Sequence, residues 1–383
     1  MAALSPAARQ ALDNAQWVMG AARHLALVPG LGARAAVWPV PFAEGLAPLL
    51  ARRGQPGVVL ASGDPFWFGA GTSIARLLAP GEWAAHPAPS CFALAAARLG
   101  WPLEATACLG LHAAPLARLR RHVAPGQRLL VLLRDGAAVA QLAAYLCAGG
   151  FGASVLHVCE ALGGLRERLR QTRADAMDWA DIAHPVLVGV ECAGEGAGLP
   201  LASGLPDALF EHDGQITKRP VRALALSALA PRAGELLWDI GAGSGSISIE
   251  WLLAHPANRA LALEADPARA ARARANAAAL GVERLTVVEG RAPDALPAGP
   301  APAAVFIGGG LSGALMAALW GRLAAGTRVV AHAVTLESEA LLAQWHAEQG
   351  GSLLRIELAE AAPLGTRRGW RASYPVVQWS AVR

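Results

Sequence analysis

A glycine-rich turn between an expected strand and an expected helix constrains this chain more than any other feature. Residues 236–240 form a short apolar run, and glycines follow at positions 241, 243 and 245. Glycines at such a turn let the backbone approach a ligand closely, and the helix start that follows presents free N–H groups to it. A dinucleotide-binding fingerprint would need its third glycine at position 246, which is Ser246. The spacing therefore favours S-adenosylmethionine over a nicotinamide dinucleotide.

Composition excludes several other classes of protein. The 383 residues are 54% hydrophobic and 16% charged, which is enough for two domains with buried cores. The net charge of +4 is mild and scattered, so it does not indicate a nucleic-acid surface. The 5 cysteines form no C-x-x-C pair, and we expect no metal and no disulfide. No stretch resembles a membrane span or a signal peptide, which predicts a cytoplasmic protein with no membrane partner.

The first half has the pattern of an α/β domain. A helix is expected to begin after its N-cap, Ser5, and to end at residues 17–20. An apolar strand at residues 57–61 then stops at a turn that contains Gly63, Asp64 and Pro65. Strands and helices alternate from there, which favours a mainly parallel sheet. The further strands are expected at residues 128–133, 154–159 and 186–190, and the helices at residues 92–99 and 137–148.

The second half is expected to be a Rossmann-like domain. Residues 196–206 are rich in glycine, proline and serine, and we interpret them as a linker between domains at residues 1–195 and 207–383. Five strands follow the linker with helices along the chain, which is the order of a class I methyltransferase, and two closing strands end it. The strands are expected at residues 236–240, 259–264, 285–289, 303–307 and 327–333, and around 353–358 and 375–379. Glu264 ends the second of these strands, 19 residues after Gly245, where a carboxylate can accept the hydroxyls of a ribose.

The end of the fourth strand indicates the kind of methyl acceptor. Enzymes that methylate the exocyclic amines of bases usually carry Asn or Asp followed by two prolines at this point. Here the residues at 308–310 are all glycine. A carbon nucleophile needs no hydrogen-bond acceptor of that kind, so the sequence favours carbon methylation.

Two sets of motifs resemble known families. In the first half, SGDPFWFG at residues 62–69, AAARLGW at 95–101 and VCEALGG at 158–164 together resemble the tetrapyrrole methylases of cobalamin biosynthesis. In the second half, HDGQITK at 212–218, GRAP at 290–293, IGGG at 307–310 and AVTLE at 333–337 resemble the decarboxylating precorrin-6Y methyltransferase domain. The joint resemblance implies a bifunctional enzyme, with an N-terminal domain of two α/β halves fused to the class I methyltransferase domain.

The resemblance also implies an activity. Such proteins convert precorrin-6Y to precorrin-8X with two S-adenosyl-L-methionine molecules and loss of one CO₂. The first domain would methylate C5, and the second would methylate C15 and decarboxylate the ring-C acetate. Members of the family begin with a strand and a glycine-rich loop ahead of the helix that starts here after Ser5. Because this chain shows neither, the first domain is expected to be impaired as given.

The resemblance and the spacing together assign site residues. The cofactor-binding residues are expected to be Gly63, Asp64 and Pro65 in the first half, and Asp239, Gly241, Gly243, Gly245, Glu264, Arg291, Ala292 and Gly308 in the second. The catalytic residues are expected to be His212, Gln215, Thr217 and Lys218, as a lid over the methyl group, and His332 at a strand end that faces the same cleft. For both histidines an ordinary surface or capping role is equally compatible with the sequence.

Further residues bear on the substrate and its alternatives. Arginines bind carboxylates bidentately, so Arg291, Arg367, Arg368 and Arg371 are candidate clamps for a polycarboxylate macrocycle. We expect Trp238, Trp251 and Trp320 to be core residues. The expected partners are a corrinoid small molecule and copies of the chain itself, with no nucleic acid. Two alternatives stay open, an RNA methyltransferase and a C15-methylating decarboxylase whose first half is a non-catalytic corrinoid scaffold.

Overall fold

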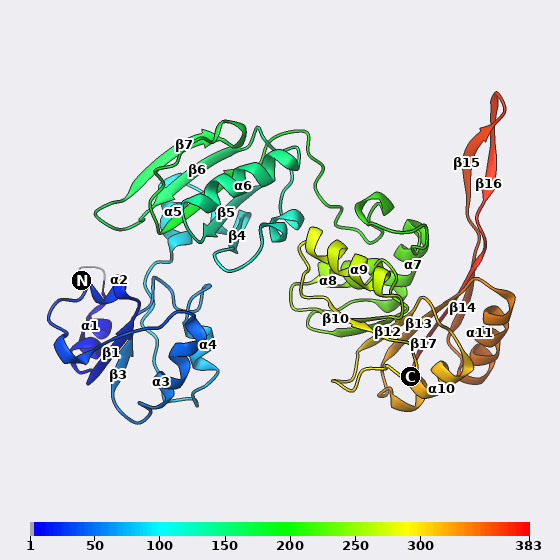
Figure 1. The fold of residues 1–383 in the computed structure, drawn as a ribbon, viewed down its shortest axis with the longest axis horizontal. Helices are drawn as coiled ribbons and strands as arrows, with labels where there is room; N and C mark the ends of the chain where they lie inside the picture. The colour runs from blue at the N-terminus through cyan, green and yellow to red at the C-terminus, as the bar shows by residue number, and fades with distance from the viewer. Residues whose placement is uncertain (1–3) are drawn as a thin grey trace. The chain divides into compact units, whose positions relative to one another are not determined.

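The computed structural model describes residues 4–383, which form two compact units. The first unit runs up to Ala114 and continues with Pro125–Gly196, and the second combines Pro115–Ala124 with Ala197–Arg383 (Figure 1). No helix in residues 4–383 is long and apolar enough to cross a membrane. Each unit is α/β, as the sequence predicts.

A three-stranded parallel sheet begins the first unit. Its order is β2-β1-β3, with β1 (Trp17–Gly20) between β2 (Ala35–Val37) and β3 (Gly57–Val59). The prediction that residues 17–20 end the first helix is wrong, because α1 (Pro6–Asp13) stops earlier and these four residues are a buried strand. A central parallel strand is apolar on both faces, and so short a run resembles the last turn of a helix. Short helices complete this region: α2 (Ala22–Leu25), α3 (Leu46–Leu50) and α4 (Gly71–Ala75).

The second sheet of the first unit has the order β4-β5-β8-β6-β7. Only β4 and β5 pair in parallel, so the prediction of a mainly parallel sheet is wrong for these five strands. The connection from β6 to β7 is too short for a crossover helix, and such a connection produces an antiparallel pair. The strands are β4 (Thr106–Gly110), β5 (Arg128–Leu133), β6 (Val155–Glu160), β7 (Arg168–Arg173) and β8 (Val186–Glu191), and the helices are α5 (Cys91–Leu99) and α6 (Ala137–Ala148).

The second unit contains a seven-stranded sheet with the order β11-β10-β9-β12-β13-β17-β14. The first five strands are parallel, and β17 runs antiparallel to both of its neighbours. The strands are β9 (Leu236–Ile240), β10 (Arg259–Glu264), β11 (Thr286–Glu289), β12 (Ala304–Ile307), β13 (Arg328–Ala333), β14 (Ser352–Ile356) and β17 (Val376–Val382). This is the methyltransferase order that the sequence predicts.

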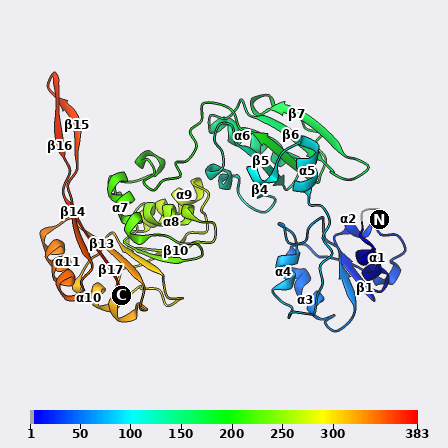
Figure 2. The ribbon, with the colours of Figure 1, turned by 180° about the vertical axis from the view of Figure 1, so that it is seen from behind.

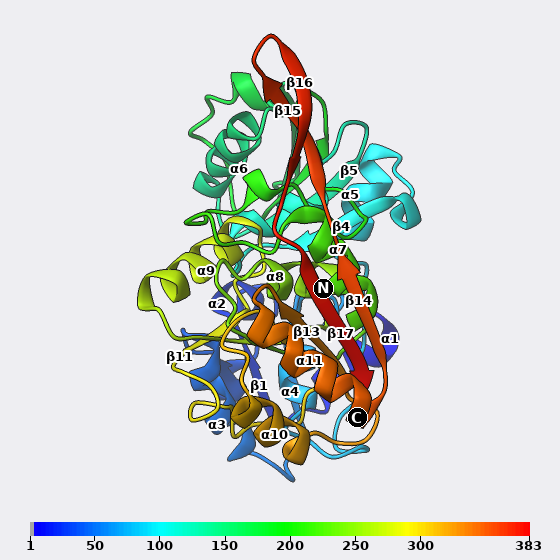
Figure 3. The same cartoon turned by 90° about the vertical axis from the view of Figure 1, so that its right-hand side faces the viewer.

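Helices cover both faces of this sheet. Alternate residues of each strand point to opposite faces of the sheet. One face packs against α7, α8 and α9, and the other face packs against α10 and α11. Figure 3 shows α11 lying along β13 and β17. Trp238 and Trp251 are buried in these cores, as expected, with 3% and 0% of their surface exposed. The helices are α7 (Arg219–Leu229), α8 (Ser246–Ala254), α9 (Pro267–Ala279), α10 (Gly313–Arg322) and α11 (Leu336–Gln349).

Two features of the second unit have no counterpart in the sequence prediction. The hairpin of β15 (Ala359–Leu364) and β16 (Arg367–Ala372) pairs only with itself and extends from the sheet of this unit (Figures 1 and 2). Residues 115–124 pack in this unit, where a side chain on Gly281 would lie 2.3 Å from the Ala117 carbonyl oxygen. The predicted boundary at residues 196–206 would place residues 115–124 in the first domain, so this boundary stays a proposal.

Candidate functional site

The glycine turn after β9 lies at the carboxyl edge of the sheet, between β9 and α8. Gly241 has a φ of +70°, and a side chain there would lie 2.6 Å from the Cα atom of Gly309, so only glycine lets the two loops approach. Gly243 has a φ of +57°, and the atom nearest to its hypothetical Cβ is the Gln215 carbonyl oxygen at 3.8 Å. A Cβ atom on Gly243 would therefore meet no close neighbour. Gly245 lies at the N-cap of α8.

Glu264 lies beside this turn at the end of β10. Its Oε2 accepts a hydrogen bond of 2.7 Å from the N–H of Gly243, and its Oε1 accepts one of 3.0 Å from the N–H of Asp266. Each carboxylate oxygen has a second lone pair that can accept a hydroxyl. The geometry is consistent with the ribose-binding role that the sequence predicts for Glu264.

Asp239, on β9, is a fully buried acid that is only half satisfied. Its Oδ2 accepts hydrogen bonds from the hydroxyl and the N–H of Ser248, at 2.7 and 3.2 Å. Its Oδ1 is buried and has no hydrogen-bond partner among the described residues. Burial and, less strongly, the nearby charge of Glu264 raise the pKa of Asp239 to about 6, although the hydrogen bonds from Ser248 lower it in part. A buried carboxylate oxygen without a partner costs free energy, which a cationic ligand group would offset.

The segment that precedes α7, residues 211–218, is here called the strap. His212 accepts a hydrogen bond of 3.0 Å at Nδ1 from the N–H of Gly214. Asp213 pairs with Arg269 and Arg272 of α9, at 2.8 and 3.2 Å, and its pKa is lowered to about 2 by a hydrogen bond from the Gln215 N–H and by these arginines. The strap therefore lies beside the glycine turn and contacts α9.

A buried arginine holds the other end of the strap. Arg222 on α7 is fully buried, donates a hydrogen bond of 2.5 Å to the Thr217 carbonyl and pairs with Glu250 of α8 at 2.5 Å. Glu250 also accepts hydrogen bonds from the N–H groups of Gly204 and Leu205, at 2.7 and 2.9 Å. This pair ties the strap and the preceding chain to both helices. Lys218 is the exposed N-cap residue of α7.

His332 lies within the sheet on β13. Its Nε2 is 2.9 Å from Oε1 of Gln378 on β17, and its ring meets Phe306 of β12 edge to face at 5.0 Å. Burial lowers its pKa, although the hydrogen bond with Gln378 raises it in part. These contacts account for a structural histidine, and a proton-transfer role for His332 stays a prediction.

The remaining predicted residues of the second unit follow β11 and β12. Gly290 donates a hydrogen bond of 2.9 Å to the Glu264 carbonyl, and Gly308 donates one of 2.9 Å to the Ile240 carbonyl. The ends of β9, β10, β11 and β12 therefore meet at one edge of the sheet, where open α/β sheets bind ligands. Arg291 is exposed there, and Ala292 packs against the neighbouring core.

In the first unit, the predicted turn follows β3. A side chain on Gly63 would lie 2.9 Å from the Pro89 carbonyl oxygen, and Asp64 Oδ1 accepts a hydrogen bond of 2.8 Å from the N–H of Phe66. Phe68 has a positive φ of +56°, which is strained for a residue other than glycine. Strained backbone gathers at functional sites, which fits a ligand-binding turn.

A polar cluster beside this turn was not predicted from the sequence. The Ser62 hydroxyl lies 2.8 Å from Nε2 of His24 and 3.2 Å from the Arg23 guanidinium. These residues follow β1 and β3, which are neighbours in the parallel sheet, so the cluster lies at its carboxyl edge. Burial, and then the charge of Arg23, lower the pKa of His24. The sequence offered a signal only for Ser62, which directly follows the apolar run at residues 57–61, because residues 17–20 were predicted to end a helix.

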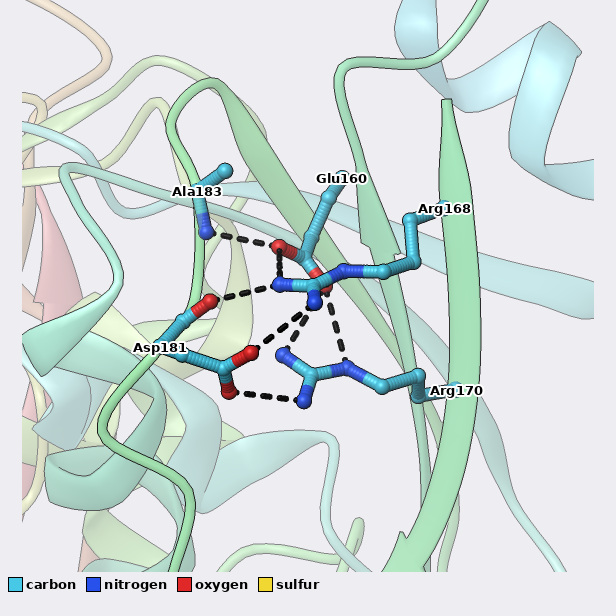
Figure 4. A network of polar contacts seen from close by, with 5 residues as sticks. All are labelled: Glu160, Arg168, Arg170, Asp181 and Ala183. Carbon is cyan, nitrogen blue, oxygen red and sulfur yellow. Dashed lines mark hydrogen bonds and ion pairs between the residues drawn. The ribbon is translucent and has the colours of Figure 1, made fainter. Parts of the chain in front are cut away.

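The acid of the VCEALGG motif has a structural role. Glu160 is fully buried at the end of β6 and pairs with Arg168 and Arg170 of β7, at 2.7 and 3.1 Å. Both arginines also pair with Asp181, and the Ala183 N–H donates to Glu160 (Figure 4). Every charged group of the network has a partner, so it fastens a loop to the sheet and offers no free ligand. Within residues 4–383, no group of three or more acidic, His or Cys side chains could hold a metal.

The comparisons with known proteins agree with this architecture. A family profile described as "Tetrapyrrole (Corrin/Porphyrin) Methylases" matches residues 1–178, and one described as "Precorrin methyltransferase domain" matches residues 208–383. A solved C-terminal domain of precorrin-6Y C5,15-methyltransferase from Rhodobacter capsulatus is 56% identical, and the match covers 48% of this chain and 100% of that one with a TM-score of 0.47.

Full-length relatives match as well. A Sinorhizobium protein named precorrin-6Y C(5,15)-methyltransferase [decarboxylating] is 51% identical over 99% of this chain and 93% of its own length. A Mycobacterium tuberculosis (strain H37Rv) protein of the same name is 39% identical over 100% of this chain and 97% of its own length. The chain therefore belongs to the precorrin-6Y C(5,15)-methyltransferase (decarboxylating) family.

Proposed function

We propose that the chain methylates precorrin-6Y at C5 and C15 with S-adenosyl-L-methionine and decarboxylates the ring-C acetate with release of one CO₂, which gives precorrin-8X. The relatives that match over nearly the whole chain carry this activity in their name. The observation that carries the proposal is the glycine turn itself, where Glu264 accepts the Gly243 N–H and no atom lies nearer than 3.8 Å to a Cβ on Gly243. We place the two catalytic domains at residues 1–195 and 207–383, with residues 196–206 as the linker.

The residues present fit S-adenosyl-L-methionine in the second domain. The unpartnered Oδ1 of Asp239 suits its ammonium group, and Glu264 suits the ribose hydroxyls. Arg291 and Ala292 follow β11 where the adenine would lie, while Gly241, Gly243, Gly245 and Gly308 leave room for the backbone to approach. When bound, the cofactor supplies an activated methyl group on a sulfonium. In the first domain the same role falls to Gly63, Asp64 and Pro65.

The chain contributes placement, exclusion of water and proton transfer. The macrocycle has electron-rich carbons, so alignment of the acceptor supplies much of the rate. Residues 308–310 offer no side-chain acceptor for an amine, which suits a carbon nucleophile. The exposed Arg291, Arg367, Arg368 and Arg371 are suited to the carboxylates of the substrate.

Decarboxylation needs a carboxylate withdrawn from water and a proton for the carbon left behind. His212 is suited to deliver that proton. Its Nδ1 accepts the Gly214 N–H, which orients the ring and leaves Nε2 as the nitrogen available to a substrate. Gln215, Thr217 and Lys218 belong to the same strap, and we propose that they form a lid over the methyl group.

Incubation of the purified chain with precorrin-6Y and S-adenosyl-L-methionine tests the proposal. Mass spectrometry should show a product with two added methyl groups that has lost one CO₂. A tRNA substrate run in parallel separates the RNA methyltransferase alternative, because labelled RNA without a modified corrinoid would contradict the proposal. A product that carries only the C15 methyl group and the decarboxylation would identify the first domain as a scaffold.

We also propose that the chain forms a homo-oligomer through the β15–β16 hairpin. The hairpin pairs only with itself, and a two-stranded hairpin has little stability alone in water. It exposes Leu364 and Trp370, at 70% and 79%, and Tyr374 beside it is exposed at 89%. Light scattering of the wild-type chain and of Trp370→Glu tests this, since a monomeric wild type would contradict it.

A further inference from the structure

One buried side chain joins the strap to the glycine turn. Asn276 of α9 is 3% exposed. Its Oδ1 accepts a hydrogen bond of 2.8 Å from the Glu211 N–H, and its Nδ2 donates to the Glu211 carbonyl at 3.0 Å. The same Nδ2 donates at 2.9 Å to the carbonyl of Ser244, which lies between Gly243 and Gly245. Asn276 thus pairs three backbone groups from two segments that are far apart in the sequence.

The chemistry of the site specifies an amide. One acceptor faces one N–H group, and two N–H hydrogens face two carbonyls, so the amide has one satisfactory orientation. Aspartate would set a carboxylate against two carbonyl oxygens, and an apolar side chain would leave three backbone groups unpaired in a buried place.

The other anchors of the strap cannot replace this one. The pairs of Asp213 with Arg269 and Arg272 are partly exposed, and water screens such pairs. Arg222 is buried, but it holds the strap only at the Thr217 carbonyl, at the far end. Between these ends, the Gln215 carbonyl lies 3.8 Å from the position of a Cβ on Gly243. The start of the strap is therefore fixed to the glycine turn by Asn276.

We infer that Asn276 is a positioning residue for methyl transfer in the second domain. It sets the distance between the strap and the glycine turn, and so the height of the space in which the methyl group meets the acceptor carbon. That Asn276 positions the strap follows from its hydrogen bonds alone. That it affects methyl transfer rests on the proposed function. Displacement of a reacting group by about 1 Å can lower a rate about 100-fold.

The test compares Asn276→Ala and Asn276→Asp with wild type in the full chain. The aspartate variant keeps the side-chain volume and the Glu211 N–H contact, so it remains informative if the alanine variant does not fold. Arg274→Ala is the matched control, because Arg274 is exposed on the same helix and pairs with Glu289 at the surface. Amide hydrogen exchange is followed at residues 211–218, together with affinity for S-adenosyl-L-methionine and the rate of C15 methylation.

The expected result is exchange in the strap that rises about tenfold or more in both Asn276 variants and not in the control. The C15 methylation rate should fall about 100-fold, and cofactor affinity by much less. Unchanged exchange in the strap, or a rate that falls only in proportion to affinity, would overturn the inference. Hydrogen exchange needs no substrate, so it tests the structural part of the inference on its own. A wild-type chain that leaves precorrin-6Y unmodified would refute the proposed function, and with it the catalytic part of this inference.

Discussion

Replacement of Gly243 by valine should remove one cofactor site without unfolding the chain. The hypothetical Cβ of Gly243 has nothing nearer than the Gln215 carbonyl oxygen at 3.8 Å, so the protein itself has room for a Cβ atom there. The cost to the fold is that of a left-handed backbone at φ +57°, about 1–2 kcal/mol. The valine methyl groups would instead occupy the space above the turn that we assign to the cofactor.

The expected loss of affinity is much larger than the loss of stability. A blocked site should bind S-adenosyl-L-methionine at least about 100-fold more weakly, which is about 2.8 kcal/mol. Calorimetric titration of the full chain should therefore lose one equivalent of binding, and urea unfolding should shift only slightly.

A matched control separates strain from occlusion. Gly234 has a φ of +82° and no atom within 4 Å of its hypothetical Cβ, and it lies before the other end of β9. Gly234→Val should cost similar stability and leave binding intact. The placement of the cofactor would be refuted if Gly243→Val bound S-adenosyl-L-methionine as tightly as wild type. It would also be refuted if Gly243→Val and Gly234→Val lost the same affinity for this cofactor.

Three further predictions concern the acids and the buried arginine around the same space. Because burial raises the pKa of Asp239 to about 6, protonation of this acid should compete with binding of the cofactor's ammonium group. Affinity for S-adenosyl-L-methionine should therefore fall about tenfold per pH unit below about 6. An affinity that does not change from pH 7 to 5 would contradict this. Glu264→Gln removes a charged acceptor beside Gly243 and should weaken binding by about 1.5–3 kcal/mol in the same titration, with the fold retained. Arg222→Met leaves Glu250 buried without its cation and should destabilise the second unit by about 3–5 kcal/mol in urea unfolding. The double variant Arg222→Met/Glu250→Leu should recover part of that loss, and no recovery would show that the pair is not coupled.

The sequence predicted those parts of the site that depend on local chemistry. Glycines at 241, 243 and 245 after an apolar strand indicate the turn, and the spacing to Glu264 indicates the neighbouring strand end. Both follow from the βαβ unit, in which short-range connections determine which strand ends meet. The structure adds the hydrogen bond between Glu264 and Gly243, which no spacing rule contains.

Other features depend on contacts between distant segments. Trp17–Gly20 becomes a strand because it pairs with β2 and β3, and four apolar residues do not by themselves distinguish a strand from a helix end. Asn276 lies in a helix rich in alanine and arginine, and its importance follows only from the buried face that the fold gives it. The unpartnered oxygen of Asp239 is likewise visible only once its neighbours are placed.

The hairpin of β15 and β16 escaped prediction for a different reason. Its strands carry proline, glycine and three arginines and show no alternation of apolar and polar residues. Alternation of apolar and polar residues indicates a strand with one buried face. This hairpin shows no such pattern because it packs against no core.

The division of labour between the two domains is tested most directly by the positions of the methyl groups in the product. Precorrin-6Y is incubated with the full chain and with S-adenosyl-L-methionine that carries a ¹³C-labelled methyl group, and the product is analysed by NMR. Wild type should label C5 and C15 and lose the ring-C acetate carboxyl group. Gly243→Val should still label C5, but it should leave C15 unlabelled and the acetate intact. C15 labelling or decarboxylation at the wild-type rate in this variant would contradict the assignment of both steps to the site above Gly243.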